Sequence, residues 1–184
     1  VPIIPKPEAR EGIEAAAKNV ASMLGPDIGT HVDVRDMRHG EKYFDWEKKG
    51  VPIRIEIGPK DIENGSVVVV RRDTGEKEAV SLENVPAKVA ETLAAIQRDL
   101  YDRALALRTE NTVKADSWDE FVSLIEDRKF VMAHWDGTAE TEKAIKDETG
   151  ATIRCLPLDF VPEEGACVKS GRPSGRRVLF AKAH

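Results

Sequence analysis

The sequence predicts an α/β protein made of two small domains joined by a helix. Helical and strand patterns alternate in both halves of the 184-residue chain, which is typical of α/β architecture. A long helical pattern separates the two halves, and no apolar run approaches the ~18 residues that a membrane span needs. We expect a first domain at residues 1–83, a linker helix at residues 84–111 and a second domain at residues 112–184.

The first domain is expected to open with the end of a strand, "VPIIP", and to continue into a helix. In "KPEAREGIEAAAKNVASMLGPD", apolar residues recur every three or four positions from Ile13 to Leu24, the spacing of one helix face. A Gly-Pro pair at residues 25–26 ends this pattern. Because the chain opens within a strand and without Met, we expect it to be part of a longer protein.

Short elements of alternating polarity follow. "THVDVRD" predicts a strand whose polar face carries His31, Asp33 and Arg35. "EKYFDWEKKG" fits a short helix, and "PIRIEIG" alternates again, with Arg54 and Glu56 on its polar side. "SVVVVRRD" predicts a buried strand, from which a "TGE" turn leads to the short strand "KEAVSL".

The most regular helical pattern starts after Asn84. "VPAKVAETLAAIQRDLYDRALAL" repeats apolar residues every three or four positions, and Pro86 sits in the first turn, where its missing N–H costs nothing. The alternation then restarts after residue 111 with helix "SWDEFVSLIED", strand "KFVMAHW", helix "TAETEKAIKDETG", strand "TIRCLPL", turn "GACVKSGRP" and strand "RRVLFAKA".

Charge is more informative locally than globally. The net charge of −5 does not mark a nucleic-acid binder. Residues 33–77, however, interleave ten basic with ten acidic side chains, as in a solvated face or in a surface that reads base edges with both donors and acceptors. Residues 169–184 carry five basic and no acidic residues. Two cysteines indicate a reducing cytoplasm rather than a secreted disulfide scaffold.

The chain has no recognisable catalytic motif of its own. None of its four histidines and two cysteines sits in a nucleophile or metalloenzyme motif. We interpret His134, at a strand end, as structural and Cys155 as a small core residue. A thiol enzyme that uses Cys155 or Cys167 is disfavoured, because neither cysteine has a recognisable partner base.

Five segments, "GEKYFDWEKKGVPIRIEIGPKD", "RRDTGEKE", "ETGATIR", "EEGACV" and "VLFAKA", closely resemble the C-terminal part of the prolyl-tRNA synthetase family, class II, in its archaeal and eukaryote-like form. The resemblance covers essentially the whole chain in order. It implies an anticodon-binding domain with a mixed twisted sheet flanked by helices, its first strand truncated here, then a linker helix and a small zinc-binding-like domain. The aminoacylation motifs of the family are absent, so this chain alone is expected to be non-catalytic, whereas the parent enzyme uses ATP and Mg²⁺.

The resemblance also implies a binding site for an anticodon. Proline anticodons end in two guanines, whose O6 and N7 acceptors suit Arg or Lys and whose N1–H and N2–H₂ donors suit a carboxylate. Splayed anticodon bases stack on aromatic rings, the role implied for Tyr43. Arg71 and Arg72 are secondary candidates for contacts with the RNA backbone. The anticodon contacts carried over from the family are Tyr43, Glu47, Arg54, Lys60, Asp61 and Lys77.

The second domain resembles a zinc domain that has lost its ligands. The four cysteine positions of the family align with Asp136, Thr141, Cys167 and Ser170. Structural zinc sites are closed tetrahedra of Cys and His, so we expect no zinc, with hydrogen bonds among Asp136, Thr141 and Ser170 in its place. The family usually ends in a tyrosine whose carboxylate points toward the catalytic domain, whereas this chain ends in His184.

The implied partners are the anticodon stem-loop of tRNA(Pro) and the catalytic domain of the same enzyme, which is a homodimer in its full-length form; no membrane is implied. A different class of function stays open, namely a protein-interaction or regulatory module that keeps the fold without reading RNA. The retained set of Glu47, Arg54, Lys60 and Lys77 favours RNA recognition, because a repurposed module has no need of it.

Overall fold

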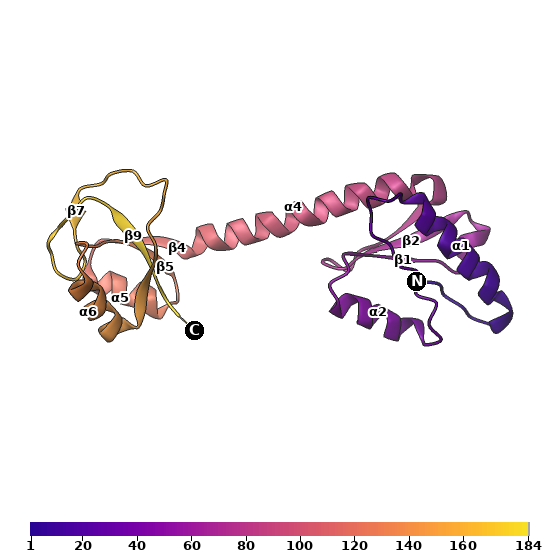
Figure 1. Cartoon of the computed structure of the whole chain (residues 1–184), viewed down its shortest axis with the longest axis horizontal. Helices are drawn as coiled ribbons and strands as arrows, with labels where there is room; N and C mark the ends of the chain where they lie inside the picture. Colours follow the sequence, from indigo (N-terminus) through magenta and orange to yellow (C-terminus); the bar gives the residue numbers. More distant parts are fainter. Residues whose placement is uncertain (184) are drawn as a thin grey trace. The chain divides into compact units, whose positions relative to one another are not determined.

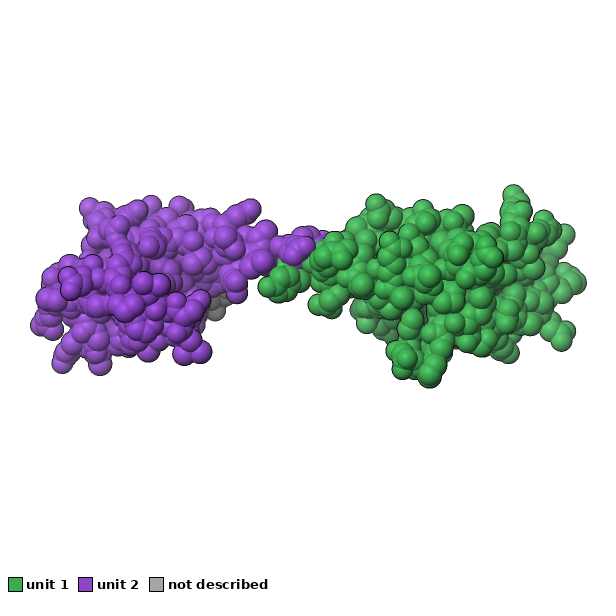
Figure 2. All heavy atoms as spheres, turned by 90° about the horizontal axis from the view of Figure 1, so that it is seen from above, with its two compact units in different colours: residues 1–101 green, residues 102–184 purple. Residues whose placement is uncertain are grey.

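The computed structural model describes residues 1–183, which form two compact units. The first comprises residues 1–101 and the second begins at residue 102 (Figure 2). The long helix α4 (Val85–Asn111) contributes residues to both units. Within the described residues, no helix is long and apolar enough to cross a membrane.

The first unit contains a three-stranded antiparallel sheet in the order β1-β2-β3 (Figure 1). The chain runs beside β1 before its first helix, where Pro2 lies opposite Ile57 in parallel orientation and the Ile3 N–H donates to the Ile57 carbonyl at 2.8 Å. This agrees with the strand end expected in "VPIIP". The elements are a 3₁₀ turn (Pro7–Ala9), α1 (Arg10–Met23), α2 (His39–Lys48), β1 (Ile53–Glu56), α3 (Pro59–Glu63), β2 (Ser66–Arg71), β3 (Lys77–Ser81), a second 3₁₀ turn (Leu82–Asn84) and α4.

Helices α1 and α4 bury their apolar stripes in a common core with the sheet. Ile13 and Val20 of α1 are 2% and 4% exposed, at the helical spacing seen in the sequence. They share one cluster with Val85 and Val89 of α4 and with Val67 of β2. Each such side chain contributes about 1.5–3 kcal/mol when it leaves water, and this packing holds β1 in place.

The strand predicted at residues 30–36 was wrong. These residues form no strand, and the predicted facing is reversed at two positions: Asp33 is 1% exposed, whereas Val34 is 42% exposed. The Asp33 carboxylate accepts hydrogen bonds from Arg35 and from the indole N–H of Trp46. The bonds from Arg35 hold the pKa of Asp33 well below its usual range. A local network of hydrogen bonds and ion pairs around Asp33 therefore replaces the expected strand.

The second unit is a four-stranded mixed sheet covered by helices, which confirms the α/β class. Its strand order is β4-β5-β9-β6, with β4 parallel to β5 and β9 antiparallel to both of its neighbours. A two-stranded hairpin of β7 and β8 lies outside this sheet. The elements are β4 (Thr112–Ala115), α5 (Trp118–Glu126), β5 (Phe130–His134), α6 (Ala139–Thr149), β6 (Ala151–Cys155), β7 (Gly165–Ala166), β8 (Pro173–Ser174) and β9 (Arg177–Lys182).

An aromatic pair lies at the centre of this second core. Phe121 of α5 and Phe180 of β9 are fully buried, and their rings meet edge to face at 5.1 Å, a favourable geometry for aromatic rings. Helices α5 and α6 each begin at a side-chain hydroxyl cap. Ser117 accepts a hydrogen bond from the Glu120 N–H, and Thr138 accepts one from the Thr141 N–H. The predicted helices and strands of this half are present, with β4 and the β7–β8 hairpin in addition.

The expectation that Cys155 is a core residue was wrong. Cys155 is exposed, and it is Cys167 that is buried. The reason is topological, because β6 is an edge strand and Cys155 ends it beside a register shift. His134 is buried, as its structural interpretation requires, with Nδ1 at 3.1 Å from the Ser174 hydroxyl.

Candidate nucleic-acid interface

Three of the predicted anticodon residues meet where α2 faces β1. The Arg54 guanidinium lies over the ring of Tyr43, with 3.9 Å between its carbon and the ring centroid. Its NH1 group donates to the Glu47 carboxylate at 2.6 Å. Tyr43 and Glu47 stand one turn apart on α2, and Arg54 projects from the polar side of β1. The result is an aromatic ring, a planar cation and a carboxylate in one continuous cluster.

Glu56 is a central residue of this cluster that the sequence analysis did not single out. Its carboxylate accepts from Arg54 Nε at 3.0 Å and lies 3.6 Å from Lys77 Nζ. Glu56 is 7% exposed, and it lies two residues after Arg54 in β1. The alternation in "RIEIG" was the available signal, because it places both side chains on one side of the strand. Glu56 links Lys77 to Arg54 and fixes the guanidinium plane.

Lys60 and Asp61 lie on α3, a five-residue helix that the sequence analysis did not predict. Asp61 accepts from the Gly58 N–H at 2.8 Å, so this carboxylate caps the start of α3. Lys60 is exposed. We call the group of Tyr43, Glu47, Arg54, Glu56 and Lys77 the Arg54 cluster. Within residues 1–183, neither Lys60 nor Asp61 forms an ion pair with it. The structure thus unites Tyr43, Glu47, Arg54 and Lys77, and it places Lys60 and Asp61 on the element that follows β1.

Arg71 and Arg72, the secondary candidates for contacts with the RNA backbone, lie at the end of β2 and directly after it. Arg71 donates to Asp73 and to Asp99, each at 2.8 Å. These two ion pairs tie the turn after β2 to helix α4. Arg72 follows in the chain, and its N–H donates to the Pro52 carbonyl. Arg71 thus forms two intramolecular ion pairs, as Arg54 does with Glu47 and Glu56.

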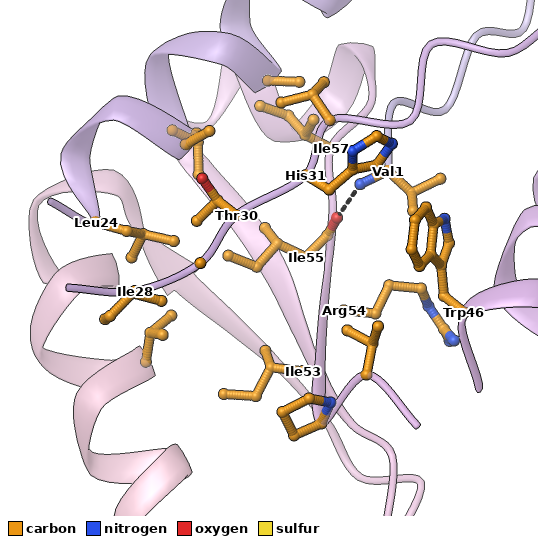
Figure 3. A pocket seen from close by; sticks show the side chains of 18 of the residues that line it. Val1, Leu24, Ile28, Thr30, His31, Trp46, Ile53, Arg54, Ile55 and Ile57 are labelled. Carbon is orange, nitrogen blue, oxygen red and sulfur yellow. Dashed lines mark hydrogen bonds between the residues drawn. The ribbon is translucent and has the colours of Figure 1, made fainter. Parts of the chain in front are cut away.

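The apolar side of β1 lines a cavity of about 340 Å³. Ile53, Ile55 and Ile57 form one wall, and Leu24 and Ile28 lie across from Arg54 and Trp46 (Figure 3). Such a lining suits apolar groups and offers few partners for the polar edges of a base. We therefore place the candidate site at the charged cluster and not in this cavity.

The Tyr43 phenol gives a spectroscopic test of the cluster. Burial and the charge of Glu56 together raise the pKa of Tyr43 to about 12, against the opposing charge of Arg54. Because the pKa is raised, the neutral phenol stabilises the fold fully below about pH 10, and this contribution is lost as the pH rises toward 12. In Tyr101→Phe, where Tyr43 is the remaining tyrosine, phenolate absorbance should appear with a midpoint near 12. A midpoint near 10 would contradict the buried environment.

The second unit contains the hydrogen-bonded cluster that the sequence predicted among Asp136, Thr141 and Ser170. One oxygen of Asp136 accepts from Thr141 Oγ1 at 2.9 Å and from Ser170 Oγ at 2.7 Å. Its other oxygen accepts from the N–H and the hydroxyl of Thr138. The side chain of Asp136 is 2% exposed. Burial alone would raise the pKa of Asp136, but the bonds from Ser170, Thr138 and Thr141 outweigh it and lower the pKa to about 2.

These residues do not fit a zinc ion. Zinc sites use thiolate and imidazole ligands in a closed tetrahedron, whereas the four aligned positions offer one carboxylate, two hydroxyls and the thiol of Cys167. The hydroxyls donate to Asp136 and so occupy its lone pairs. In residues 1–183, no group of three or more His, Cys, Asp or Glu side chains is placed to hold a metal ion.

Comparison with known proteins agrees with both units. The profile of the family described as "Anticodon binding domain" matches residues 1–92. The profile described as "Prolyl-tRNA synthetase, C-terminal" matches residues 118–184. The fold and the two matches thus define anticodon-binding and C-terminal domains of an aminoacyl-tRNA synthetase.

Curated relatives cover the whole chain. It is 46% identical over 187 residues to a proline–tRNA ligase of Flavobacterium johnsoniae, and 44% identical over 187 residues to that of Cytophaga hutchinsonii, with all of this chain and 38% of each relative aligned. It is 45% identical over 181 residues to that of Chlorobium luteolum, with 94% of this chain and 37% of the relative aligned. The chain belongs to the prolyl-tRNA synthetase family and spans somewhat more than a third of the length of these relatives.

The alignment of positions 136, 141, 167 and 170 with a four-cysteine metal site can be tested by supplying the three missing thiols. In the triple variant Asp136→Cys, Thr141→Cys and Ser170→Cys, the native Cys167 completes four thiols. We expect this variant to take up one Zn²⁺ and to become less stable when a chelator removes it, since metal binding couples to folding. Adding Cys167→Ser should weaken uptake strongly. A triple variant that takes up no metal would show that these four positions do not form one site.

Proposed function

We propose that the first unit recognises the anticodon of tRNA(Pro) by reading its two guanines. The observation that carries this proposal is the Glu47–Arg54 pair held over Tyr43, because it joins a carboxylate, a guanidinium and an aromatic ring within contact distance. Arg54 suits the O6 and N7 acceptors of one guanine, and Glu47 suits the N1–H and N2–H₂ donors of the other. Tyr43 supplies the surface on which a splayed base stacks.

The residues on α3 complete the proposed site. Lys60 is an exposed donor for a guanine edge, and Asp61 holds the start of α3 through its bond to Gly58. Lys77, anchored near Glu56, is the third cation at the site. A good bidentate contact discriminates between bases by ~1–3 kcal/mol. Two guanines read by these groups therefore account for a large part of the selection of the cognate tRNA.

We further propose that the chain is the C-terminal part of a proline–tRNA ligase, which joins proline to tRNA(Pro) with ATP and Mg²⁺ through a catalytic domain outside this sequence. The relatives' names and the partial coverage of their length support this. In this proposal the chain alone holds no catalytic group, and its partners are the anticodon stem-loop, the catalytic domain of the same enzyme and a second enzyme subunit.

The test is binding of this chain to a hairpin with the proline anticodon loop and to the same hairpin with both guanines replaced by adenines. We expect at least about tenfold preference for the guanine hairpin, equivalent to 1.4 kcal/mol. Lys60→Ala should reduce that preference without changing thermal stability, because Lys60 is exposed. Equal binding of both hairpins would refute guanine reading. Failure to bind either would favour a protein-interaction module.

A further inference from the structure

A polar groove of about 290 Å³ lies between the first ten residues and the segment that leads into α2. It is distinct from the Arg54 cluster, with which it shares no lining residue. Among its lining residues, all described by the structure, one is a carboxylate, Asp36. Its cations are Lys6, Arg10, Arg35, Arg38 and Lys42. The groove is therefore strongly basic in a chain whose net charge is negative.

Internal ion pairs neutralise only part of this charge. Arg10 is paired with Glu14 and with Asp36, and Arg35 is paired with Asp33 and Asp45. Lys6 and Arg38 are exposed. In the described part of the chain, neither of their side chains has an ion pair or a hydrogen bond. These two cations are uncompensated at the rim of the groove.

Lys42 adds a buried positive group to the lining. It is 2% exposed, and its amine donates to the main-chain carbonyl of Asp33 at 3.1 Å. An ammonium group has three N–H donors, and this one is matched to a neutral oxygen. Burying a lysine is costly, so its position against a basic groove favours an anionic occupant.

The groove and the Arg54 cluster are connected through helix α2. Groove residues Arg38 and His39 stand at its amino end, where the helix dipole also favours negative charge. Tyr43 follows one turn later, and the rings of His39 and Tyr43 lie 5.6 Å apart. An RNA strand whose base rests on Tyr43 has its backbone within reach of the amino end of the helix.

We propose that this groove binds a backbone phosphate of the RNA whose bases are read at the Arg54 cluster, with Arg38 and Lys6 as its principal contacts. This inference rests on the proposed function. Phosphate contacts fix the register of an RNA on a protein without reading its sequence. The groove thus positions the anticodon loop, and the Arg54 cluster discriminates between its bases.

The test measures affinity for the guanine and adenine hairpins over a range of salt concentrations. Arg38→Ala and Lys6→Ala should each weaken binding about five-fold at 0.1 M salt, because one lost phosphate contact lowers the salt slope by ~0.7. The loss should be equal for both hairpins. Lys18→Ala removes an exposed cation from α1, outside the groove, and should leave both affinity and slope unchanged.

Several outcomes overturn the inference. If the unsubstituted chain prefers guanine but Arg38→Ala and Lys6→Ala bind as it does, the groove assignment fails and the proposed function stands. If the two variants lose affinity for the guanine hairpin alone, these residues read bases. Inorganic phosphate should displace the hairpin only at far higher concentration than unlabelled hairpin does. Equal displacement would assign the groove to free phosphate, and no RNA binding at all would overturn both proposals.

Discussion

Replacing Arg54 with alanine is expected to weaken binding of the guanine hairpin about 100-fold. Two effects combine in this loss. The variant lacks the donors for a guanine edge, worth ~1–3 kcal/mol, and it removes the 2.6 Å contact that holds the Glu47 carboxylate in place. Binding should be measured by fluorescence anisotropy at constant salt, because phosphate contacts make every affinity salt-dependent.

Matched variants separate base reading from loss of charge or of structure. Arg54→Lys keeps the charge but loses the planar fork, so it should restore little of the guanine preference. Arg98→Ala removes an exposed arginine of α4 and should bind as the unsubstituted chain does. Arg54→Ala also removes a partner of the buried Glu56, so thermal unfolding must accompany the binding data. A variant that remains folded and loses affinity equally for both hairpins would contradict a role in reading guanine.

Replacing Asp136 with alanine is expected to destabilise the second unit by about 3 kcal/mol. The carboxylate accepts four hydrogen bonds from three residues, and removing it leaves the buried Thr141 hydroxyl without its acceptor, which costs more than the bond contributes on average. For a domain of this size, the unfolding midpoint should fall by about 12–24 °C. Amide hydrogen exchange in β5 and β9 would report this unit separately from the first.

The pH dependence gives this prediction a second readout. Because the pKa of Asp136 is lowered to about 2, its stabilising effect is fully present above about pH 4 and is lost as the pH falls toward 2. The difference in unfolding free energy between Asp136→Ala and the unsubstituted chain should therefore shrink as the pH falls from about 4 toward 2. Asp147→Ala removes a carboxylate from an exposed i,i+4 pair with Lys143 and should cost less than about 0.5 kcal/mol. If Asp136→Ala lowers the stability of the second unit as little as Asp147→Ala does, the structural role of the cluster is refuted.

Much of the candidate site could be predicted from local patterns. The alternation in "RIEIG" placed Arg54 on the polar side of a strand, and the helical stretch around Tyr43 placed Glu47 one turn further on. Both elements are present as β1 and α2. The family resemblance, with the residue types at positions 136, 141 and 170, implied hydrogen bonds in place of a metal, and the structure contains the bonds from Thr141 and Ser170 to Asp136.

Other features required contacts between distant segments. Glu56 lies at the centre of the cluster because β3 brings Lys77 beside it, and the sequence around Glu56 carries no sign of that neighbour. Cys155 had the pattern of a core residue but ends an edge strand. Asp33 alternated as if on a polar strand face, yet Arg35 and Trp46 enclose it.

The sequence by itself determined the α/β class, the order of most elements, the family and the residue types available at the site. These depend on side-chain periodicity and composition, which are local properties of the chain. Only the tertiary structure decided which charges are paired and which are left over, as for Arg35 and Arg38, three positions apart. Pairing and burial depend on which strands and helices become neighbours, and residues far apart in sequence jointly set that arrangement.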